Sequence, residues 1–213
     1  MAKYLKKFEN HTAYEASSLI LPNVSICVQE NDVHYNPSSP TPQYVDLGLP
    51  SGTLWAKWNV GATSETEYGN YYKYGKGSAQ YPATSGESNY SGTENPLAAS
   101  ADTAAQEWGG DWHMPTSAQC AELTANTTYE WTTIDGVNGG KFTAQNGNYI
   151  FIPAAGYCYN GILDYVGSSG FVWSSTPYRD GNNSYYLFFT TNGYKKVDRF
   201  SRKDGFSVRP VIG

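Results

Sequence analysis

Charged residues and histidine are scarce in this sequence, and cysteine is scarcer than a disulfide scaffold requires. Charged residues make up 15% of the 213 residues, the net charge is -5, and there are only three histidines. A chain this rich in aromatic residues and this low in net charge does not have the composition of a disordered protein or of a charged helical bundle. The sequence therefore predicts a folded, loop-rich protein with a substantial hydrophobic core.

The cysteines are odd in number and far apart. Cys27, Cys120 and Cys158 include no pair with the spacing of a metal site. We therefore expect three free thiols rather than a disulfide framework, and we expect no catalytic metal and no cofactor.

Long hydrophobic runs are also missing. The opening residues "MAKYLKKFENHTAYEA" contain neither the apolar centre nor the small-residue cleavage site of a secretory signal. No apolar run approaches the length of a transmembrane helix. We expect a protein that has no signal peptide and is not inserted into a membrane.

The patterns that are present divide the chain into two modules. In residues 1–42, a T-x-x-E capping box at Thr12 and Glu15 predicts a short helix over residues 13–19, followed by a short hairpin and a proline-rich linker. We interpret residues 1–42 as an attachment or oligomerisation module and residues 43–213 as a separate domain.

The second module has strand-like segments at both ends and helices between them. Strands are expected at residues 44–47 and 53–56, and a long surface excursion follows at residues 75–96. Further strands are expected from Tyr149 onward. One helix should open near Asp102 and end at the Gly109–Gly110 pair. A second should open at the capping box of Thr116 and Gln119 and run through Leu123. This order predicts an α+β domain with two helices, a small and mostly antiparallel sheet, and neighbouring first and last strands.

Five ordered segments resemble a known family. They are "VDLGLPSGTLWA", "EWGGDWHMPT", "IFIPAAGY", "VWSST" and "GFSVRPV". Together they are similar to the C-type-lectin-fold domains of gut Bacteroidetes and their phages, in the branch that includes formylglycine-generating enzymes. That group contains the variable proteins of diversity-generating retroelements. The resemblance implies a C-type lectin fold over residues 44–213, and the N-terminal segment separately resembles an opening shared by gut-phage structural proteins.

In the variable proteins, the diversified ligand-binding positions follow the "WSST" segment. Here the alternation in "SYYLFFT" predicts that Leu187 and Phe189 point to the core and that the side chains between them face solvent. Tyr185 is interpreted as ordinary packing. Rigid aromatic residues among Asn, Ser and Gly are also typical of antibody paratopes. We predict that twelve residues share one solvent-exposed face and bind the ligand there: Tyr178, Arg179, Asp180, Asn182, Asn183, Tyr186, Phe188, Thr190, Tyr194, Asp198, Phe200 and Ser201.

Charge separates this C-terminal segment from the rest of the chain. Residues 171–213 contain seven Lys or Arg and three Asp, a net of +4, and the remainder carries -9. A basic face favours an anionic ligand or an acidic surface. No nucleic-acid-binding motif accompanies the charges, so we do not expect nucleic acid as a partner. Arg209 is predicted to be structural, bonded to a buried acid or carbonyl.

Catalysis is not expected. The formylglycine branch uses a cysteine pair near the C-terminal end of the fold, and this chain has no cysteine after Cys158. No Ser-His-Asp or paired-carboxylate arrangement is evident. "ENP" at Glu94–Pro96 resembles the calcium-sugar motif of lectins, but it lies in the surface excursion and no "WND" accompanies it. Calcium-dependent sugar binding is therefore not expected, and a structural calcium ion stays an open question.

Three functions fit these patterns. The leading hypothesis is a receptor-recognition protein displayed on a phage virion after synthesis in the bacterial cytoplasm. It would bind a protein or glycan receptor on the host surface and other virion proteins through its N-terminal module, with homo-oligomerisation left open. The alternatives are a structural or decoration protein of the virion and a bacterial surface adhesin, which the missing signal peptide disfavours.

Overall fold

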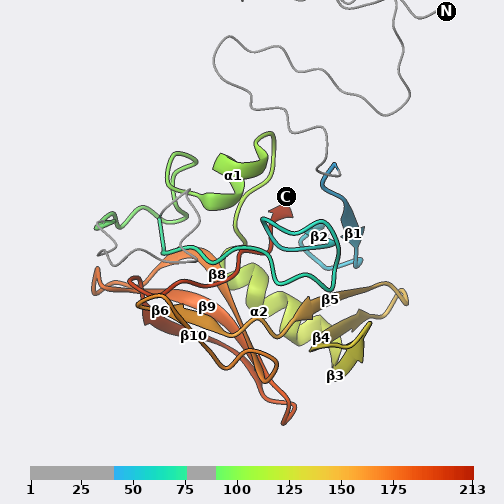
Figure 1. Ribbon diagram of the computed structural model, residues 1–213. Coiled ribbons are helices and arrows are strands. Elements are labelled where there is room, and N and C mark those ends of the chain that lie inside the picture. The colour runs from blue at the N-terminus through green and yellow to red at the C-terminus, as the bar shows by residue number, and fades with distance from the viewer. Residues whose placement is uncertain (1–40, 76–89) are drawn as a thin grey trace, which may run out of the picture. The chain divides into compact units, whose positions relative to one another are not determined.

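The computed structural model describes residues 41–75 and 90–213 (Figure 1). These residues lie in one compact unit, Pro40–Gly213, and contain two short helices and eleven strands that pair antiparallel in four small sheets. The mixed α+β class is confirmed. The predicted helix and hairpin of the first module, Cys27 and most of the surface excursion lie outside the described residues. None of the helices in the described ranges is long and apolar enough to cross a membrane.

The first and last strands share one sheet. β1 (Tyr44–Asp46) pairs with β2 (Leu54–Ala56), and β11 (Val211–Ile212) pairs with the other side of β2. Val211 lies opposite Trp55 in this register. The prediction that the first and last strands are neighbours is therefore wrong, because β2 lies between β1 and β11 in the sheet that all three share.

Both helices begin where their capping residues predict. α1 (Thr103–Trp108) starts after Asp102, whose Oδ1 accepts a hydrogen bond from Ala105 N at 3.1 Å, and it ends at Gly109. α2 (Ser117–Asn126) starts with the predicted capping box. Thr116 Oγ1 accepts from Gln119 N at 3.2 Å, and Gln119 Oε1 accepts from Thr116 N at 2.8 Å. Local polar side chains therefore determine where each helix starts.

A three-stranded sheet follows α2 directly. β3 (Thr127–Ile134) and β4 (Val137–Ala144) form a hairpin, and β5 (Tyr149–Pro153) pairs with β4. The hairpin turns at Asp135 and Gly136, with φ of 48° and 81°. Positive φ at both central residues is the geometry that an Asp-Gly pair favours in a two-residue hairpin turn.

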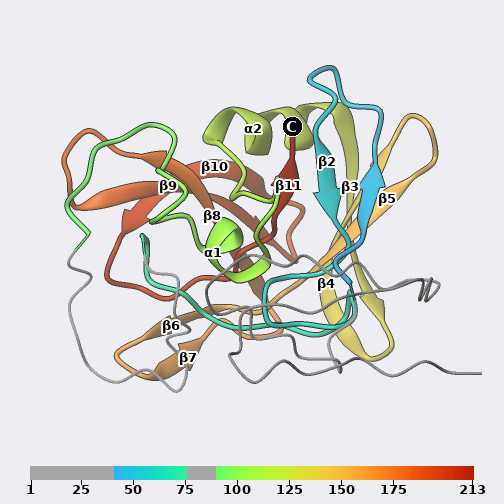
Figure 2. The same cartoon turned by 90° about the horizontal axis from the view of Figure 1, so that it is seen from above.

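The third sheet carries the predicted binding segment. It contains β8 (Ser169–Pro177), β9 (Asn183–Thr190) and β10 (Lys195–Ser201) in the order β10-β9-β8. α2 lies on one side of this sheet. The small hairpin of β6 (Tyr157–Tyr159) and β7 (Ile162–Asp164) lies on the other side (Figure 2). The sheet is therefore covered on both faces along part of its length.

Two hydrophobic clusters fill the space on either side of this sheet. On the α2 side, Leu187 and Phe189 of β9 pack with Leu123. On the other side, Trp173 of β8 and Tyr186 of β9 pack with Phe206. The ring centroids of Trp173 and Phe206 are 4.1 Å apart, with the planes at 18°. Because both faces of β9 are covered, its side chains do not alternate between the core and solvent as we expected from the sequence.

Arg209 connects three segments at the centre of the domain. Its side chain is fully buried and donates from Nε to Asn59 Oδ1 at 2.8 Å. It also donates from Nη1 to Ala56 O at 3.1 Å and from Nη2 to Phe151 O at 2.9 Å. The prediction of a structural arginine bonded to buried carbonyls is confirmed. Burial lowers the pKa of Arg209 from its ordinary value.

Candidate ligand-binding face

The alternation predicted for β9 is right on one side of the strand and wrong on the other. Leu187 and Phe189 are buried, as expected. Tyr186 is also buried, at 5% exposure, because Phe206 and neighbouring rings cover the side of the sheet that we expected to face solvent. Phe188 and Thr190 are half-buried. The prediction that Tyr186 is solvent-exposed is therefore wrong.

Rings from two sheets meet on the side of β9 and β10 away from α2, and we call this surface the aromatic face. Its members are Tyr157, Tyr165, Phe188, Tyr194 and Phe200. The ring centroids of Tyr157 and Phe200 are 5.7 Å apart, and those of Phe188 and Tyr194 are 6.2 Å apart. Tyr157 also stacks on Tyr165 at 5.9 Å. Distances of this size are those of favourable aromatic pairs.

A layer of buried rings supports the aromatic face from below, and we call it the aromatic floor. It consists of Phe171, Tyr186 and Phe206. Phe171 lies 5.0 Å from the Phe188 ring and stacks on Tyr186 at 5.7 Å. The floor holds the outer rings in place, so little side-chain freedom would be lost when the face contacts a partner.

The hairpin of β6 and β7 adds exposed apolar surface that sequence reasoning missed. Four of the seven large exposed hydrophobic side chains in the described residues belong to it or follow it directly: Tyr159, Ile162, Tyr165 and Val166. Ile162 is 70% exposed. The Asn160–Gly161 pair between two short apolar runs is a hairpin signal and could have identified this element. Gathered exposed apolar residues are typical of interaction surfaces.

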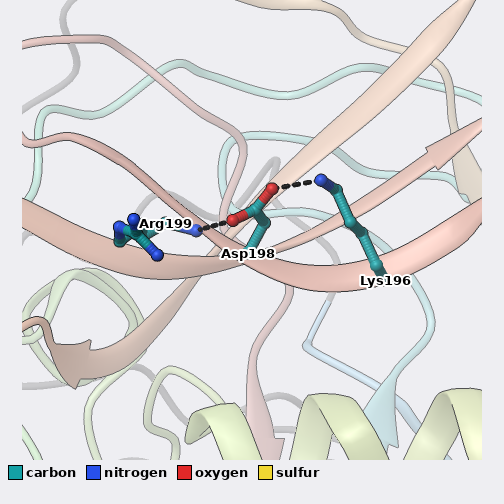
Figure 3. A network of polar contacts seen from close by, with 3 residues as sticks. All are labelled: Lys196, Asp198 and Arg199. Carbon is teal, nitrogen blue, oxygen red and sulfur yellow. Dashed lines mark hydrogen bonds and ion pairs between the residues drawn. The ribbon is translucent and has the colours of Figure 1, made fainter.

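A polar network borders the aromatic face on β10 (Figure 3). Asp198 forms an ion pair with Lys196 through Oδ2 and accepts a hydrogen bond from Arg199 N through Oδ1 at 2.8 Å. The hydrogen bond to Lys196 is the main cause that lowers the pKa of Asp198, and the same bond raises the pKa of Lys196. Both groups stay ionised at neutral pH and hold each other in position beside the rings.

One of the predicted residues, Tyr178, lies apart from the aromatic face, where it packs with two residues that were not predicted to bind, Tyr185 and Arg199. The rings of Tyr178 and Tyr185 are 5.6 Å apart, and Arg199 lies 4.8 Å from the centre of the Tyr178 ring. Tyr185 lies opposite Arg199 in the register of β9 and β10. Because side chains alternate along a strand, both point to the side of the sheet away from the aromatic face. This group therefore belongs to the side of the sheet on which α2 lies.

Asp180 organises the loop between β8 and β9. Its Oδ1 accepts from Asn182 N at 2.9 Å and from Asn183 N at 2.8 Å, and its Oδ2 accepts from Asn183 Nδ2 at 2.6 Å. These hydrogen bonds lower the pKa of Asp180, and the bond from the Asn183 side chain is the largest cause. Asp180 is thus already engaged in holding the shape of the loop.

The twelve predicted residues therefore do not share one face. The structure places five of them on or beside the aromatic face: Phe188, Thr190, Tyr194, Asp198 and Phe200. Six lie at the β8–β9 loop or on the α2 side of the sheet: Tyr178, Arg179, Asp180, Asn182, Asn183 and Ser201. Tyr186 lies in the floor.

The positive charge of the C-terminal segment is only partly on the surface. Arg202 and Arg209 are buried. Arg202 donates from Nε to Ser184 Oγ at 2.9 Å and from Nη1 to Gly92 O at 3.0 Å, so it anchors the segment near residue 92. The basic surface is smaller than the sequence predicted, because two of its seven cations stabilise the interior.

The reactive side chains of the described residues are dispersed. Cys120 and Cys158 are free thiols buried in different clusters, and burial raises the pKa of Cys120 to about 12. No group of three or more His, Cys, Asp or Glu side chains within residues 41–75 and 90–213 could hold a metal ion. The Nδ1 atom of His113 lies 3.0 Å from Met114 O, and its Nε2 atom lies 3.2 Å from Gly213 O.

Two hollows of about 660 and 390 Å³ lie away from the aromatic face. Tyr44, Trp58, Glu65 and Tyr149 are among the residues that line the larger one. No residue of the aromatic face lines either hollow. The aromatic face is therefore a surface of exposed and half-buried rings that lies outside both hollows, and such a surface fits a macromolecular partner better than a small ligand.

Comparison with known proteins adds one match. Residues 120–211 match a family described as a domain of unknown function (DUF8237). Comparisons with curated proteins and with solved structures found no significant match. The matched segment begins in α2, ends in β11 and includes every residue of the aromatic face.

Proposed function

We propose that the domain is a non-catalytic ligand-binding module with a C-type lectin fold. In this proposal a phage virion displays it, and it binds a protein or glycan receptor on the surface of a bacterial host. The observation that carries the proposal is the aromatic face: exposed and half-exposed rings from β9, β10 and the β6–β7 hairpin rest on a buried aromatic floor.

The composition of this surface supports recognition. Tyr165 and Tyr194 are each 53% exposed, while Phe188 and Phe200 are half-buried. Binding hot spots are enriched in aromatic anchors that are already ordered, since such side chains bury a large area at a small entropy cost. The Lys196–Asp198 pair at the border supplies charge for orientation.

The fold supports the lectin-like assignment at a coarser level. Two helices, small antiparallel sheets and a C-terminal strand beside β2 are compatible with a C-type lectin fold. The "WSST" segment lies in β8 with Ser174 and Ser175 buried, as expected for a fixed region beside variable positions. Under this proposal Tyr186 is invariant, because it belongs to the floor, and diversification is confined to exposed and half-exposed positions.

Binding to intact bacterial cells tests the proposal. Fluorescently labelled protein should bind a subset of Bacteroides strains saturably in flow cytometry. Cells treated with protease and cells treated with periodate would then separate a protein receptor from a glycan receptor. If no strain binds and the protein is instead found only as a constituent of purified virions, the structural or decoration role replaces receptor recognition.

Diversification has its own test. In close relatives, substitutions should concentrate on Tyr178, Arg179, Tyr194, Phe200 and similar surface positions, while Tyr186 and "WSST" stay unchanged. Substitutions spread evenly over the domain would favour a structural role.

A further inference from the structure

β10 forms an open edge of its sheet. It is the outermost strand in the order β10-β9-β8 and lies at the lower side of the sheet in Figure 1. Thr190 N donates to Tyr194 O at 2.9 Å, and Arg202 N donates to Asn182 O at 3.0 Å. In an antiparallel pair, residues alternate between bonding to the partner strand and pointing away from it. The backbone groups of Lys195, Val197 and Arg199 therefore point away from β9.

One of these three outward N–H groups already has a partner. Arg199 N donates to the carboxylate of Asp198, which also forms the ion pair with Lys196 (Figure 3). The N–H groups of Lys195 and Val197 donate no hydrogen bond to any acceptor among the described residues. Unpaired edge groups are a template for another strand.

We propose that β10 is a strand-addition site for an extended, acidic segment of a partner protein. The segment would lie beside β10 as a fourth strand. This site uses the backbone edge rather than the rings of the aromatic face, and the Lys196–Asp198 pair borders both sites.

Charge complementarity selects the occupant. β10 carries Lys195, Lys196 and Arg199 against Asp198, a net of +2, although the whole chain carries -5. Opposite charges directly across two strands are favourable, and like charges are unfavourable. A second copy of the chain would bring two strands of +2 together, whereas an acidic strand would neutralise this edge.

Asp198 gives the edge a further selectivity. Its carboxylate covers the Arg199 N–H, so an arriving strand must displace it and offer its own carbonyl to that donor. The displaced carboxylate also leaves Lys196, which then needs a new anionic partner. A neutral strand supplies only the carbonyl, but an acidic strand supplies both groups. Removal of the Asp198 side chain should therefore open the edge and, because β10 then carries a higher positive charge, strengthen the binding of an acidic strand.

Fluorescence anisotropy with a labelled, alternating Glu-Val peptide tests this inference on the full chain. The Glu-Val peptide should bind, and salt should weaken the binding. A Lys-Val peptide and a Glu-Val peptide with alternate backbone nitrogens methylated should bind at least about tenfold more weakly. Asp198→Ala should strengthen binding of the Glu-Val peptide.

A substitution in the strand itself separates backbone pairing from charge attraction. Val197→Pro removes one outward N–H, which an edge strand tolerates, and should weaken binding about tenfold or more. Val197→Thr keeps that N–H and should bind like the wild type. In the unsubstituted protein, the amides of Lys195 and Val197 should gain protection from hydrogen exchange when the peptide is added, a readout that does not depend on how Val197→Pro folds.

Three results would overturn the inference. Equal binding of the methylated peptide would mean adsorption by charge alone. Unchanged exchange of the Lys195 and Val197 amides would mean that the peptide binds elsewhere. Concentration-dependent dimerisation in sedimentation, abolished by Val197→Pro, would assign the edge to a second copy of this chain.

Discussion

Tyr186 supports the aromatic face from below. Its ring lies 5.2 Å from Phe206, 5.9 Å from Phe200 and 6.1 Å from Phe188, so it contacts both the floor and the outer layer. Burial raises the pKa of its hydroxyl well above the usual range. A substitution here acts on the stability of the domain before it acts on any ligand.

The first prediction compares Tyr186 with an exposed ring of the same type. Tyr186→Ala should lower the free energy of unfolding by about 3 kcal/mol or more, because it leaves a cavity between packed rings. Tyr194→Ala, at a side chain 53% exposed, should change it by less than about 0.5 kcal/mol. Urea denaturation measures both, and equal effects would mean that Tyr186 does not form part of the core.

Asp204 gives a prediction in pH. Its side chain is 4% exposed, and Oδ1 has no hydrogen-bond partner among the described residues. Burial raises its pKa to about 6, and the charge of Lys73 offsets part of that shift. An unfolded aspartate titrates near 3.9, so the folded state holds its proton to higher pH. The cost of ionising Asp204 is absent below pH about 4, and it reduces stability progressively as pH rises towards about 6.

Asp204→Asn removes that cost. The variant should match the wild type near pH 4 and exceed its stability at pH 7 by about 2 to 3 kcal/mol. Thermal unfolding across this pH range measures the difference. A constant difference between the two proteins at all pH values would show that Asp204 does not titrate in this window.

At the scale of elements, local signals and long-range packing contribute differently. The caps at Asp102 and Thr116 act within a few residues, and both helix starts were predicted from them. The burial of β9 on both faces depends on Leu123 on one side and Phe206 on the other, which lie outside the strand, and alternation alone could not reveal it. For the same reason Phe188, Tyr194 and Phe200 were among the predicted binding residues, but the neighbouring rings Tyr157 and Tyr165 of the β6–β7 hairpin were not.

The capping box of α2 is testable as an element. Thr116→Ala removes the acceptor for Gln119 N and should destabilise the domain by about 1 kcal/mol. Thr124→Ala, inside the same helix, is the control and should be neutral or slightly stabilising, since alanine is the better helix former. Chemical denaturation distinguishes them, and equal losses would indicate that the box contributes nothing.

At the scale of the whole molecule, one side chain joins the sheets. Arg209 binds carbonyls at the end of β2 and in β5, and a buried acceptor without a donor costs about 1 to 3 kcal/mol. Arg209→Leu leaves several such acceptors and should unfold the domain or destabilise it by more than about 3 kcal/mol. Arg179→Leu, at an exposed arginine, should have little effect on the melting temperature.

Two tyrosines of equal exposure test the proposal that the domain binds a receptor through the aromatic face. Tyr194 on the aromatic face and Tyr44 on β1 are each 53% exposed, so serine substitutions should have similar, small effects on stability. The measurement is the affinity of each labelled variant for the bacterial strain that the wild-type protein binds. We expect Tyr194→Ser to weaken binding about tenfold or more and Tyr44→Ser to bind like the wild type. Unchanged binding by Tyr194→Ser together with a loss of binding in Tyr44→Ser would overturn the proposal and place the site on the sheet of β1, β2 and β11.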